Sequence, residues 1–231
     1  MQNFPANFHA LVIGASGGIG AAFLKLLEAE QQCGQVIGLH RSSQPAIDFD
    51  DESSIADAAQ QLQAYAPFHL IINAAGLLHT DDWMPEKKLG DLNFAQMQKT
   101  FQINTFGPAL MLRYFTPLLD KQRGVIAMLS AKVGSIGDNQ LGGWYSYRAS
   151  KAALNMLVKT ASIELKRSHP NTVCVALHPS TVNTALSRPF RGEQIGRAAP
   201  VAAQDMLNLL DTLSAKDSGE FFAYDGLRLP W

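Results

Sequence analysis

The chain has 231 residues, of which 47% are hydrophobic and 17% are charged, and its formal net charge at pH 7 is −1. This length predicts one large domain or at most two small ones, and the composition excludes a disordered chain. A charge so close to zero gives no electrostatic attraction to nucleic acid or to an anionic membrane, so neither is expected as a partner.

Cysteine and histidine usage narrows the class of protein further. Cys33 and Cys174 lie far apart, and the first eight residues lack the basic region of a signal peptide. We therefore expect a reduced, cytoplasmic protein without a disulfide framework. The apolar runs are too short to span a bilayer. The scattered histidines show no metal-ligand spacing, so no metal site is expected.

Short apolar runs alternate with amphipathic stretches along the whole chain. The runs predict strands at residues 9–13, 36–39, 46–49, 68–73, 124–129, 172–177 and 220–224. The 3–4 spacing of apolar residues predicts helices at 17–31, 52–64, 93–119, 145–166 and 201–213, with a kink at Pro108 in the third. This alternation indicates one Rossmann-type, doubly wound parallel sheet of about seven strands, with helices on both faces, over residues 1–231.

A glycine-rich loop follows the first predicted strand. It contains Gly14, Ser16, Gly18, Ile19 and Gly20, with the glycines spaced Gly-x-x-x-Gly-x-Gly. Glycines let the backbone approach a pyrophosphate closely, and the helix that follows offers free N–H groups. The loop therefore predicts a dinucleotide site, and a plain strand-to-helix turn is the alternative.

The end of the second predicted strand bears on the choice of dinucleotide. An acidic residue there binds the ribose 2′-hydroxyl of NAD, whereas this chain has Arg41 followed by Ser42 and Ser43. Arginine pairs with a 2′-phosphate, and the serines can donate to it. NADP(H) is thus the preferred cofactor, with NAD(H) second, and a solvated surface arginine is the alternative interpretation.

Tyr147 and Lys151 lie four residues apart in a predicted helix, so they share one face. A nearby ammonium group favours the phenolate and is expected to lower the tyrosine pKa. Such a tyrosine can give a proton to a carbonyl oxygen or take one from an alcohol. The pair alone also fits a packing contact.

Together these motifs resemble the short-chain dehydrogenase/reductase family over nearly the whole chain. Asn73-Ala74-Ala75-Gly76 resembles the family segment beside the cofactor, and Asp48 stands where the family holds the adenine. Asn104 matches the helix asparagine that holds a proton-relay water. In the segment that contacts the nicotinamide, Pro179, Val182 and Thr184 match. The stretches 143–155 and 219–231 resemble a subgroup with the myxobacterial C-factor proteins and sniffer-like carbonyl reductases.

Two residues depart from the family pattern. The family places a serine three residues before Gly134, where this chain has Ala131 between Ser130 and Ser135. We expect Ser130 to orient the substrate carbonyl because it ends the strand, with Ser135 as the alternative. Ser180 stands where the family commonly has glycine.

The resemblance implies an NADP(H)-dependent oxidoreductase acting on a small carbonyl or alcohol substrate, with Tyr147, Lys151, Ser130 and Asn104 as catalytic residues. It also implies that Tyr147 and Lys151 bind the cofactor, with Lys151 on the nicotinamide ribose. A dinucleotide-binding, cell–cell signalling or regulatory protein with little turnover is the alternative. Residues 185–200 are expected to form a substrate lid, with Leu78, His79 and Trp83 opposite. The family's paired helices predict a homodimer or homotetramer.

Overall fold

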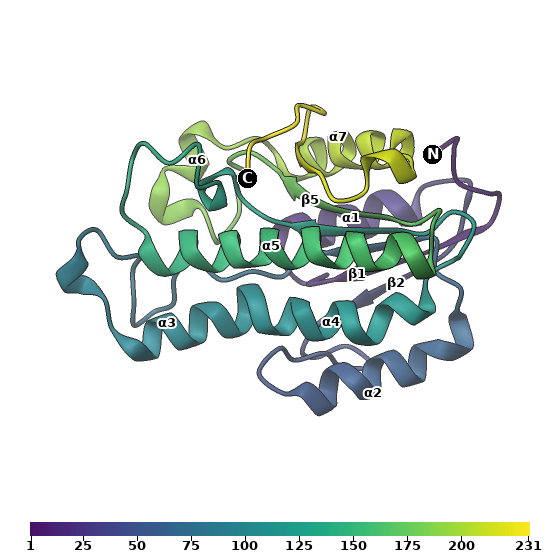
Figure 1. The fold of residues 1–231 in the computed structure, drawn as a ribbon, viewed down its shortest axis with the longest axis horizontal. Helices are drawn as coiled ribbons and strands as arrows, with labels where there is room; N and C mark the ends of the chain where they lie inside the picture. Colours follow the sequence, from purple (N-terminus) through teal and green to yellow (C-terminus); the bar gives the residue numbers. More distant parts are fainter.

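The computed structural model describes every residue from Met1 to Trp231 and contains one six-stranded parallel sheet. Its strand order is β2-β1-β3-β4-β5-β6 (Figure 1). The strands are β1 (Phe8–Ile13), β2 (Cys33–Leu39), β3 (Leu70–Asn73), β4 (Val125–Leu129), β5 (Val173–His178) and β6 (Phe221–Ala223). Because all strands are parallel, their carboxyl ends meet at one edge, where ligands bind in such sheets.

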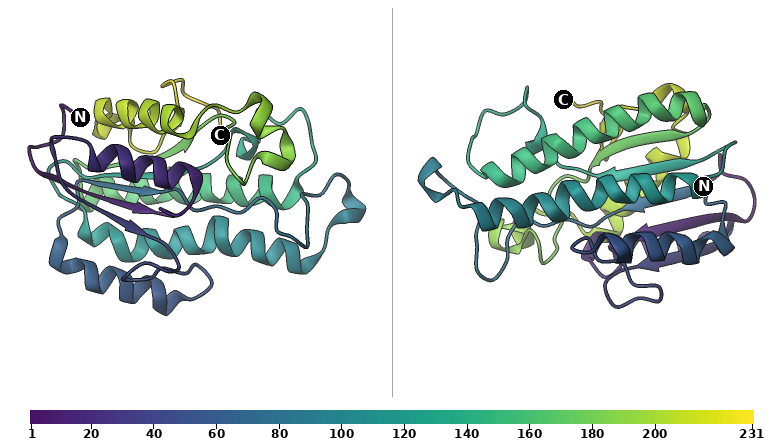
Figure 2. Two further views of the ribbon diagram at one scale, coloured as in Figure 1. Left: turned by 180° about the vertical axis from the view of Figure 1, so that it is seen from behind. Right: turned by 60° about the horizontal axis from the view of Figure 1, so that its bottom comes forward.

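Helices cover both faces of the sheet. They are α1 (Gly18–Glu28), α2 (Glu52–Leu62), α3 (Phe94–Phe101), α4 (Gly107–Phe115), α5 (Tyr145–Ser168), α6 (Gly192–Ile195) and α7 (Ala199–Thr212). Helices α2, α4 and α5 lie on the near side in Figure 1, and α1 and α7 lie in front when the molecule is seen from behind in Figure 2. None of the helices has the length and apolar character needed to cross a membrane.

Alternating side chains of each strand build two cores. In β1, Leu11 and Ile13 belong to the core beneath α2, α4 and α5, and Ala10 and Val12 belong to the core beneath α1 and α7. Strands with both faces buried give the continuous apolar runs that predicted a doubly wound sheet, and this prediction is confirmed.

The predicted strand at 46–49 is wrong, and the sheet accordingly has six strands. Ile47 and Phe49 are buried, but their segment crosses to α2 without joining the sheet. The N–H of Ile47 donates to the carbonyl of His40 at 3.1 Å, which closes a loop after β2. Phe49 packs so closely on Gly107 of α4 that no Cβ would fit there. The apolar run at 46–49 therefore reflects the burial of these side chains in a loop and does not indicate a strand.

The long helix expected at 93–119 consists of α3, a π-helical turn at Gln102–Phe106, and α4. The distortion precedes Pro108 instead of centring on it. Pro108 has no N–H, so the carbonyl of Asn104 has no donor four residues later and the helix widens there. This turn lies at the carboxyl edge of the sheet, beside the predicted site.

Candidate active site

The glycine loop joins β1 to α1 and touches two other predicted cofactor segments. Gly14 has a φ of +81°, and a Cβ there would lie 2.7 Å from the nitrogen of Ala75. A Cβ on Gly18 would lie 2.6 Å from Cγ2 of Thr184, and one on Gly20 would lie 2.1 Å from the carbonyl oxygen of Gly14. Main-chain atoms exclude a Cβ at Gly14 and Gly20, and a Cβ at Gly18 would displace the side chain of Thr184. The loop is therefore shaped by its packing against the 74–76 and 179–184 segments.

A cavity of about 280 Å³ opens beside this loop. Its lining includes the predicted cofactor residues Gly14, Ser16, Arg41, Asp48, Ala74, Ala75 and Gly76. His40 and Lys99, which the sequence analysis did not single out, also line it. Arg41 is exposed and makes no ion pair with any acidic side chain. The cavity fits the adenosine end of a dinucleotide, with a free cation at its rim.

The remaining predicted cofactor residues lie outside that cavity. Asn73 is 1% exposed, and its side-chain oxygen accepts the N–H of Ala75 at 3.1 Å, so it shapes the main chain at the end of β3. Gly18, Ile19 and Gly20 start α1. Pro179, Val182 and Thr184 follow β5, and Thr184 contacts the glycine loop as described above.

Asn104 lies in the π-helical turn and is fully buried. Its side-chain oxygen accepts the N–H of Leu77 at 2.7 Å, and its Nδ2 donates to the carbonyl of Leu77 at 2.7 Å and to Oγ of Ser150 at 3.1 Å. These bonds tie the loop after β3 to α5. Oδ1 of Asn104 and Nζ of Lys151 would both lie 3.6 Å from a Cβ on Gly76, so Gly76 sits between them.

Tyr147 and Lys151 occupy the first two turns of α5 and are 9% and 3% exposed. The ammonium nitrogen of Lys151 lies 5.9 Å from the centre of the Tyr147 ring. It donates to the carbonyl of Leu129, the last residue of β4, at 2.9 Å. This bond fixes the lysine at the carboxyl edge of the sheet.

Burial opposes the charged form of both side chains. It raises the pKa of Tyr147 to about 12 and lowers the pKa of Lys151 to about 8. The expected lowering of the tyrosine pKa by Lys151 is therefore wrong, because burial of the phenol raises its pKa. At neutral pH, Tyr147 retains its proton, and Lys151 titrates within reach of neutrality.

The two candidate serines differ in their partners. The hydroxyl of Ser130 donates to Oδ1 of Asn155 at 2.6 Å, and Nδ2 of Asn155 is buried without a partner. The hydroxyl of Ser135 donates to the carbonyl of Trp231 at 3.2 Å and accepts the N–H of Asp138 at 3.1 Å. Ser130 is thus hydrogen-bonded to a residue of α5, whereas Ser135 joins the loop that precedes α5 to Trp231.

Ser180, where the family commonly has glycine, has a φ of +66°. Glycine occupies this left-handed region at no steric cost, which accounts for the family's choice. Two main-chain bonds hold the same segment to the far end of the expected lid: Arg197 N–H to the Thr181 carbonyl and Asn183 N–H to the Arg197 carbonyl, both 2.9 Å.

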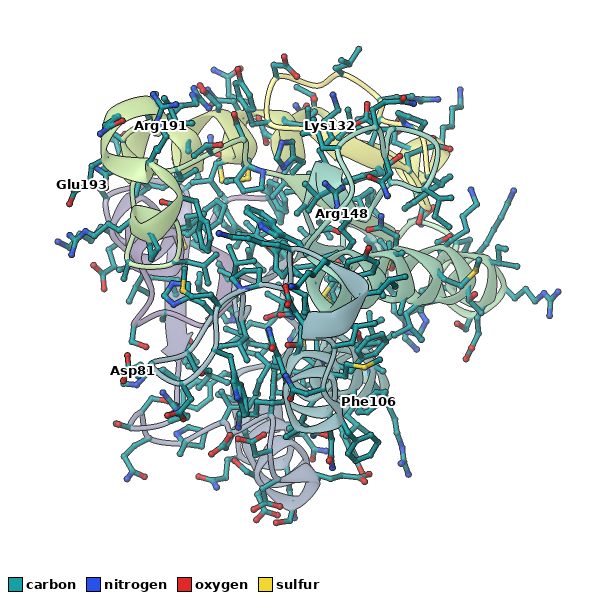
Figure 3. All side chains as sticks on the ribbon, turned by 90° about the vertical axis from the view of Figure 1, so that its left-hand side faces the viewer. Asp81, Phe106, Lys132, Arg148, Arg191 and Glu193 are labelled. Carbon is teal, nitrogen blue, oxygen red and sulfur yellow. The ribbon has the colours of Figure 1, made fainter.

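Three aromatic rings meet near Tyr147. Phe190, in the expected lid, lies 4.9 Å from Trp144 and 5.8 Å from His79, and Trp144 lies 6.2 Å from Tyr147. Figure 3 looks onto this end of the molecule, with Arg191 and Glu193 of the lid on one side and Arg148 nearer the middle. His79 was expected opposite the lid, and Phe190 falls within the expected lid range 185–200. Trp144 was given no role, although its position just before α5 was the available signal.

Comparison with known proteins identifies relatives of this chain. A family model described as short chain dehydrogenase matches residues 8–194. C-signal of Myxococcus xanthus is 36% identical over 167 residues, which cover 71% of this chain and 93% of that relative. The 1-hydroxy-2-glutathionyl-2-methyl-3-butene dehydrogenase of Rhodococcus sp. (strain AD45) is 31% identical over 189 residues, or 81% of this chain and 80% of that enzyme.

Solved structures share the whole fold. The NADPH-bound carbonyl reductase from chicken fatty liver aligns with a TM-score of 0.85 and 26% identity, covering 99% of this chain and 96% of that one. The carbonyl reductase Sniffer of Drosophila melanogaster aligns with a TM-score of 0.84 and 23% identity, covering 98% and 100%. The six strands and their helices therefore have the arrangement found in these proteins.

Proposed function

Because the chain belongs to the short-chain dehydrogenase family, we propose that it is an NADP(H)-dependent reductase of small carbonyl compounds, with Tyr147 as the proton donor. The observation that carries the proposal is the buried Tyr147–Lys151 pair at the carboxyl edge of the sheet, next to the 74–76 segment that packs on the glycine loop. A carbonyl reductase with NADPH bound is among the similar structures, which supports the cofactor and the reaction class.

Each residue of the site has a separate task in this proposal. NADP(H), when bound, supplies the hydride. Tyr147 gives its proton to the developing alkoxide, and its high pKa keeps that proton in place at neutral pH. Lys151 holds the ribose and resupplies the proton. The main-chain carbonyl of Asn104, to which Pro108 has no N–H to donate, would hold a water that leads the proton in.

We retain Ser130 as the residue that orients the substrate carbonyl. In the observed contact its hydroxyl hydrogen points to Asn155. The opposite orientation of the Asn155 amide would let the unpartnered Nδ2 donate to Ser130 instead. That arrangement satisfies a buried donor and frees the serine hydroxyl to donate to the substrate.

Carbonyl reduction should be measured with a panel of aldehydes, ketones and quinones, using NADPH and NADH separately. We expect at least one class of carbonyl to be reduced. At equal and low cofactor concentrations, the turnover rate should be higher with NADPH than with NADH. The same assays run in reverse, with alcohols and NADP, should be slower at pH 7, because the oxidation needs a phenolate that burial disfavours. No turnover with any carbonyl would refute the reductase assignment.

The cofactor preference depends on Arg41. The Arg41→Asp variant should bind NADPH more weakly by at least about 1.5 kcal/mol, because a charge-assisted bond to the 2′-phosphate is lost. Binding of NADH should change little, so the ratio of the two dissociation constants is the measurement. Lys25→Asp is a matched control, since Lys25 is also an exposed cation and lies in the last turn of α1, outside the cavity. Equal affinities of the unmodified protein for both cofactors would contradict the assignment.

The lid is also a proposal. We propose that residues 185–200 close over the substrate, supported by the contact of Phe190 with Trp144 and His79. The bonds of Arg197 to Thr181 and Asn183 give the lid a fixed base. Arg191 and Glu193 are exposed on the lid, so their side chains are poorly placed to bind a substrate beneath it.

We propose a homodimer or homotetramer. Apolar side chains are exposed along α3, the π-helical turn and α5: Phe94, Met97, Phe106, Met156 and Ile163. Met156 and Ile163 are seven residues apart and share one face of α5. Figure 1 shows helices α3, α4 and α5 toward the viewer, and Phe106 projects outward in Figure 3.

Sedimentation at micromolar concentration should give at least a dimer. A Met156→Lys variant should dissociate, because it places a charge in an apolar interface, and a Leu227→Lys variant, on a different surface, should not. A monomeric unmodified protein would contradict the proposal.

Both cysteines are free and the thiol of Cys174 is buried, which supports the proposed cytoplasmic location.

The similarity to C-signal favours a second candidate, a signalling protein that binds a dinucleotide with little turnover. Both candidates require NADP(H) binding, so binding alone does not separate them. Turnover does: the signalling candidate requires that the cofactor binds while every carbonyl in the panel is left unreduced.

A further inference from the structure

Glu86 is a buried acid that the proposed mechanism does not use. It lies in the loop between β3 and α3, and it is 2% exposed. No lysine, arginine or histidine forms an ion pair with it. A buried carboxylate is costly unless other groups compensate its charge, so its surroundings need an account.

The compensating groups belong to the first turn of α5. One oxygen of Glu86 accepts the main-chain N–H of Ser146 at 3.2 Å, and the other accepts the Ser146 hydroxyl. The main-chain carbonyl of Glu86 accepts the N–H of Trp144 at 2.5 Å. Sixty residues separate the two segments, so these bonds hold the loop before α3 against the start of the helix.

This start of α5 lacks a capping residue of its own. Trp144, which precedes the helix, offers no side-chain cap and has the left-handed angles φ 52° and ψ 44°. The free N–H groups of a first turn need acceptors, and the positive end of the helix dipole favours an anion. Glu86, from another part of the chain, supplies a hydrogen-bond acceptor and a negative charge to this first turn.

The residue held by Glu86 stands directly before Tyr147. On the other side of the turn, the guanidinium of Arg148 donates to the carbonyls of Gly142, Gly143 and Val133 at 3.0 to 3.1 Å. Arg148 thereby fixes the loop that enters the helix, and Glu86 fixes the helix itself. Both contacts therefore act on the turn of α5 that carries Tyr147.

We propose that Glu86 is a positioning residue for Tyr147: its carboxylate holds the first turn of α5 and so sets where the phenol meets the substrate oxygen. The inference rests on the proposed role of Tyr147. A shift of about 1 Å in a reacting group can lower a rate by about a hundredfold. Losing the tether should therefore affect the rate constant far more than cofactor binding. The glycine loop and Arg41 lie on other segments, and Lys151, further along α5, is held separately by its bond to the carbonyl of Leu129 at 2.9 Å.

The test measures kcat, KM and the NADPH dissociation constant of the full chain. In Glu86→Ala, kcat should fall at least about tenfold, while the NADPH dissociation constant stays within about twofold. Glu86→Gln should recover at least about a third of the rate, because its amide oxygen still accepts a bond from Ser146. Glu86→Asp should behave like the alanine variant, because its shorter side chain draws the turn out of place.

Asp120→Ala provides the matched control. Asp120 lies near the opposite end of the sheet and also accepts two main-chain N–H groups, those of Gln122 and Arg123, at 2.9 and 2.7 Å. Its loss should lower the melting temperature and leave kcat unchanged. A merely structural role for Glu86 would give this same pattern, with no selective loss of kcat.

Several results would overturn the inference. They are an unchanged kcat in Glu86→Ala, a glutamine variant as slow as the alanine variant, or equal losses of rate and NADPH affinity. If Glu86→Ala does not fold, an unchanged kcat in Glu86→Asp overturns it. If Tyr147→Phe is inactive and the Glu86 variants are fully active, only this inference fails; if Tyr147→Phe is active, the proposed function fails first.

Discussion

Replacing Tyr147 with phenylalanine should lower carbonyl reduction by at least about a hundredfold and leave NADPH binding nearly intact. General acid catalysis contributes about 10²–10⁴-fold, and the phenylalanine ring has no proton to give. The ring itself packs beside Trp144 and lies against the buried start of α5, so the fold should persist. Steady-state rates with the best carbonyl of the panel, together with NADPH binding by fluorescence, measure the two effects.

Tyr145→Phe is the matched control, because it removes a phenol two residues away from a half-buried position. It should retain the rate of the unmodified protein. If Tyr147→Phe kept more than about a tenth of that rate, Tyr147 would not be the proton donor. Another acid or water would then supply the proton, and the family would describe the fold without the mechanism.

The sequence predicted the parts of the fold that local pattern determines. The strands β1, β3, β4 and β5 are buried on both faces, so each gives a short apolar run. Because these runs alternate with helical patterns, each predicts a buried parallel strand. The run at 46–49 has the same pattern for another reason, since Ile47 and Phe49 belong to the core and Phe49 packs against Gly107 of α4. Periodicity cannot tell a buried strand from a buried loop.

The same limit applies to the site. The glycine loop and the Tyr147–Lys151 pair are each local, so their spacing alone indicates their geometry. The contacts of Glu86 with Ser146, and of His79 with Phe190, join residues that are far apart in the chain. No spacing rule pairs them. The direction of the Tyr147 pKa also required the fold, because it depends on how completely the phenol is buried.

Lys151→Met should lose both rate and cofactor affinity, because one ammonium has two tasks in the proposal. Methionine keeps the apolar stem in the tight space beside Gly134, where Lys151 Cβ leaves no room for a second side chain. It removes the hydrogen bond to the carbonyl of Leu129 and the charge near Tyr147. We expect kcat to fall at least about a hundredfold and the NADPH dissociation constant to rise about tenfold.

The pH dependence gives an independent measure of the same residue. Burial lowers the pKa of Lys151 to about 8, so its ammonium form prevails below pH 8 and is lost as the pH rises through that value. In the unmodified protein, kcat/KM for NADPH reports the free enzyme, and it should decline about tenfold per unit above pH 8. In Lys151→Met this decline should disappear from the residual rate. A decline that persisted unchanged would assign the titration to another group and leave Lys151 with only a packing role.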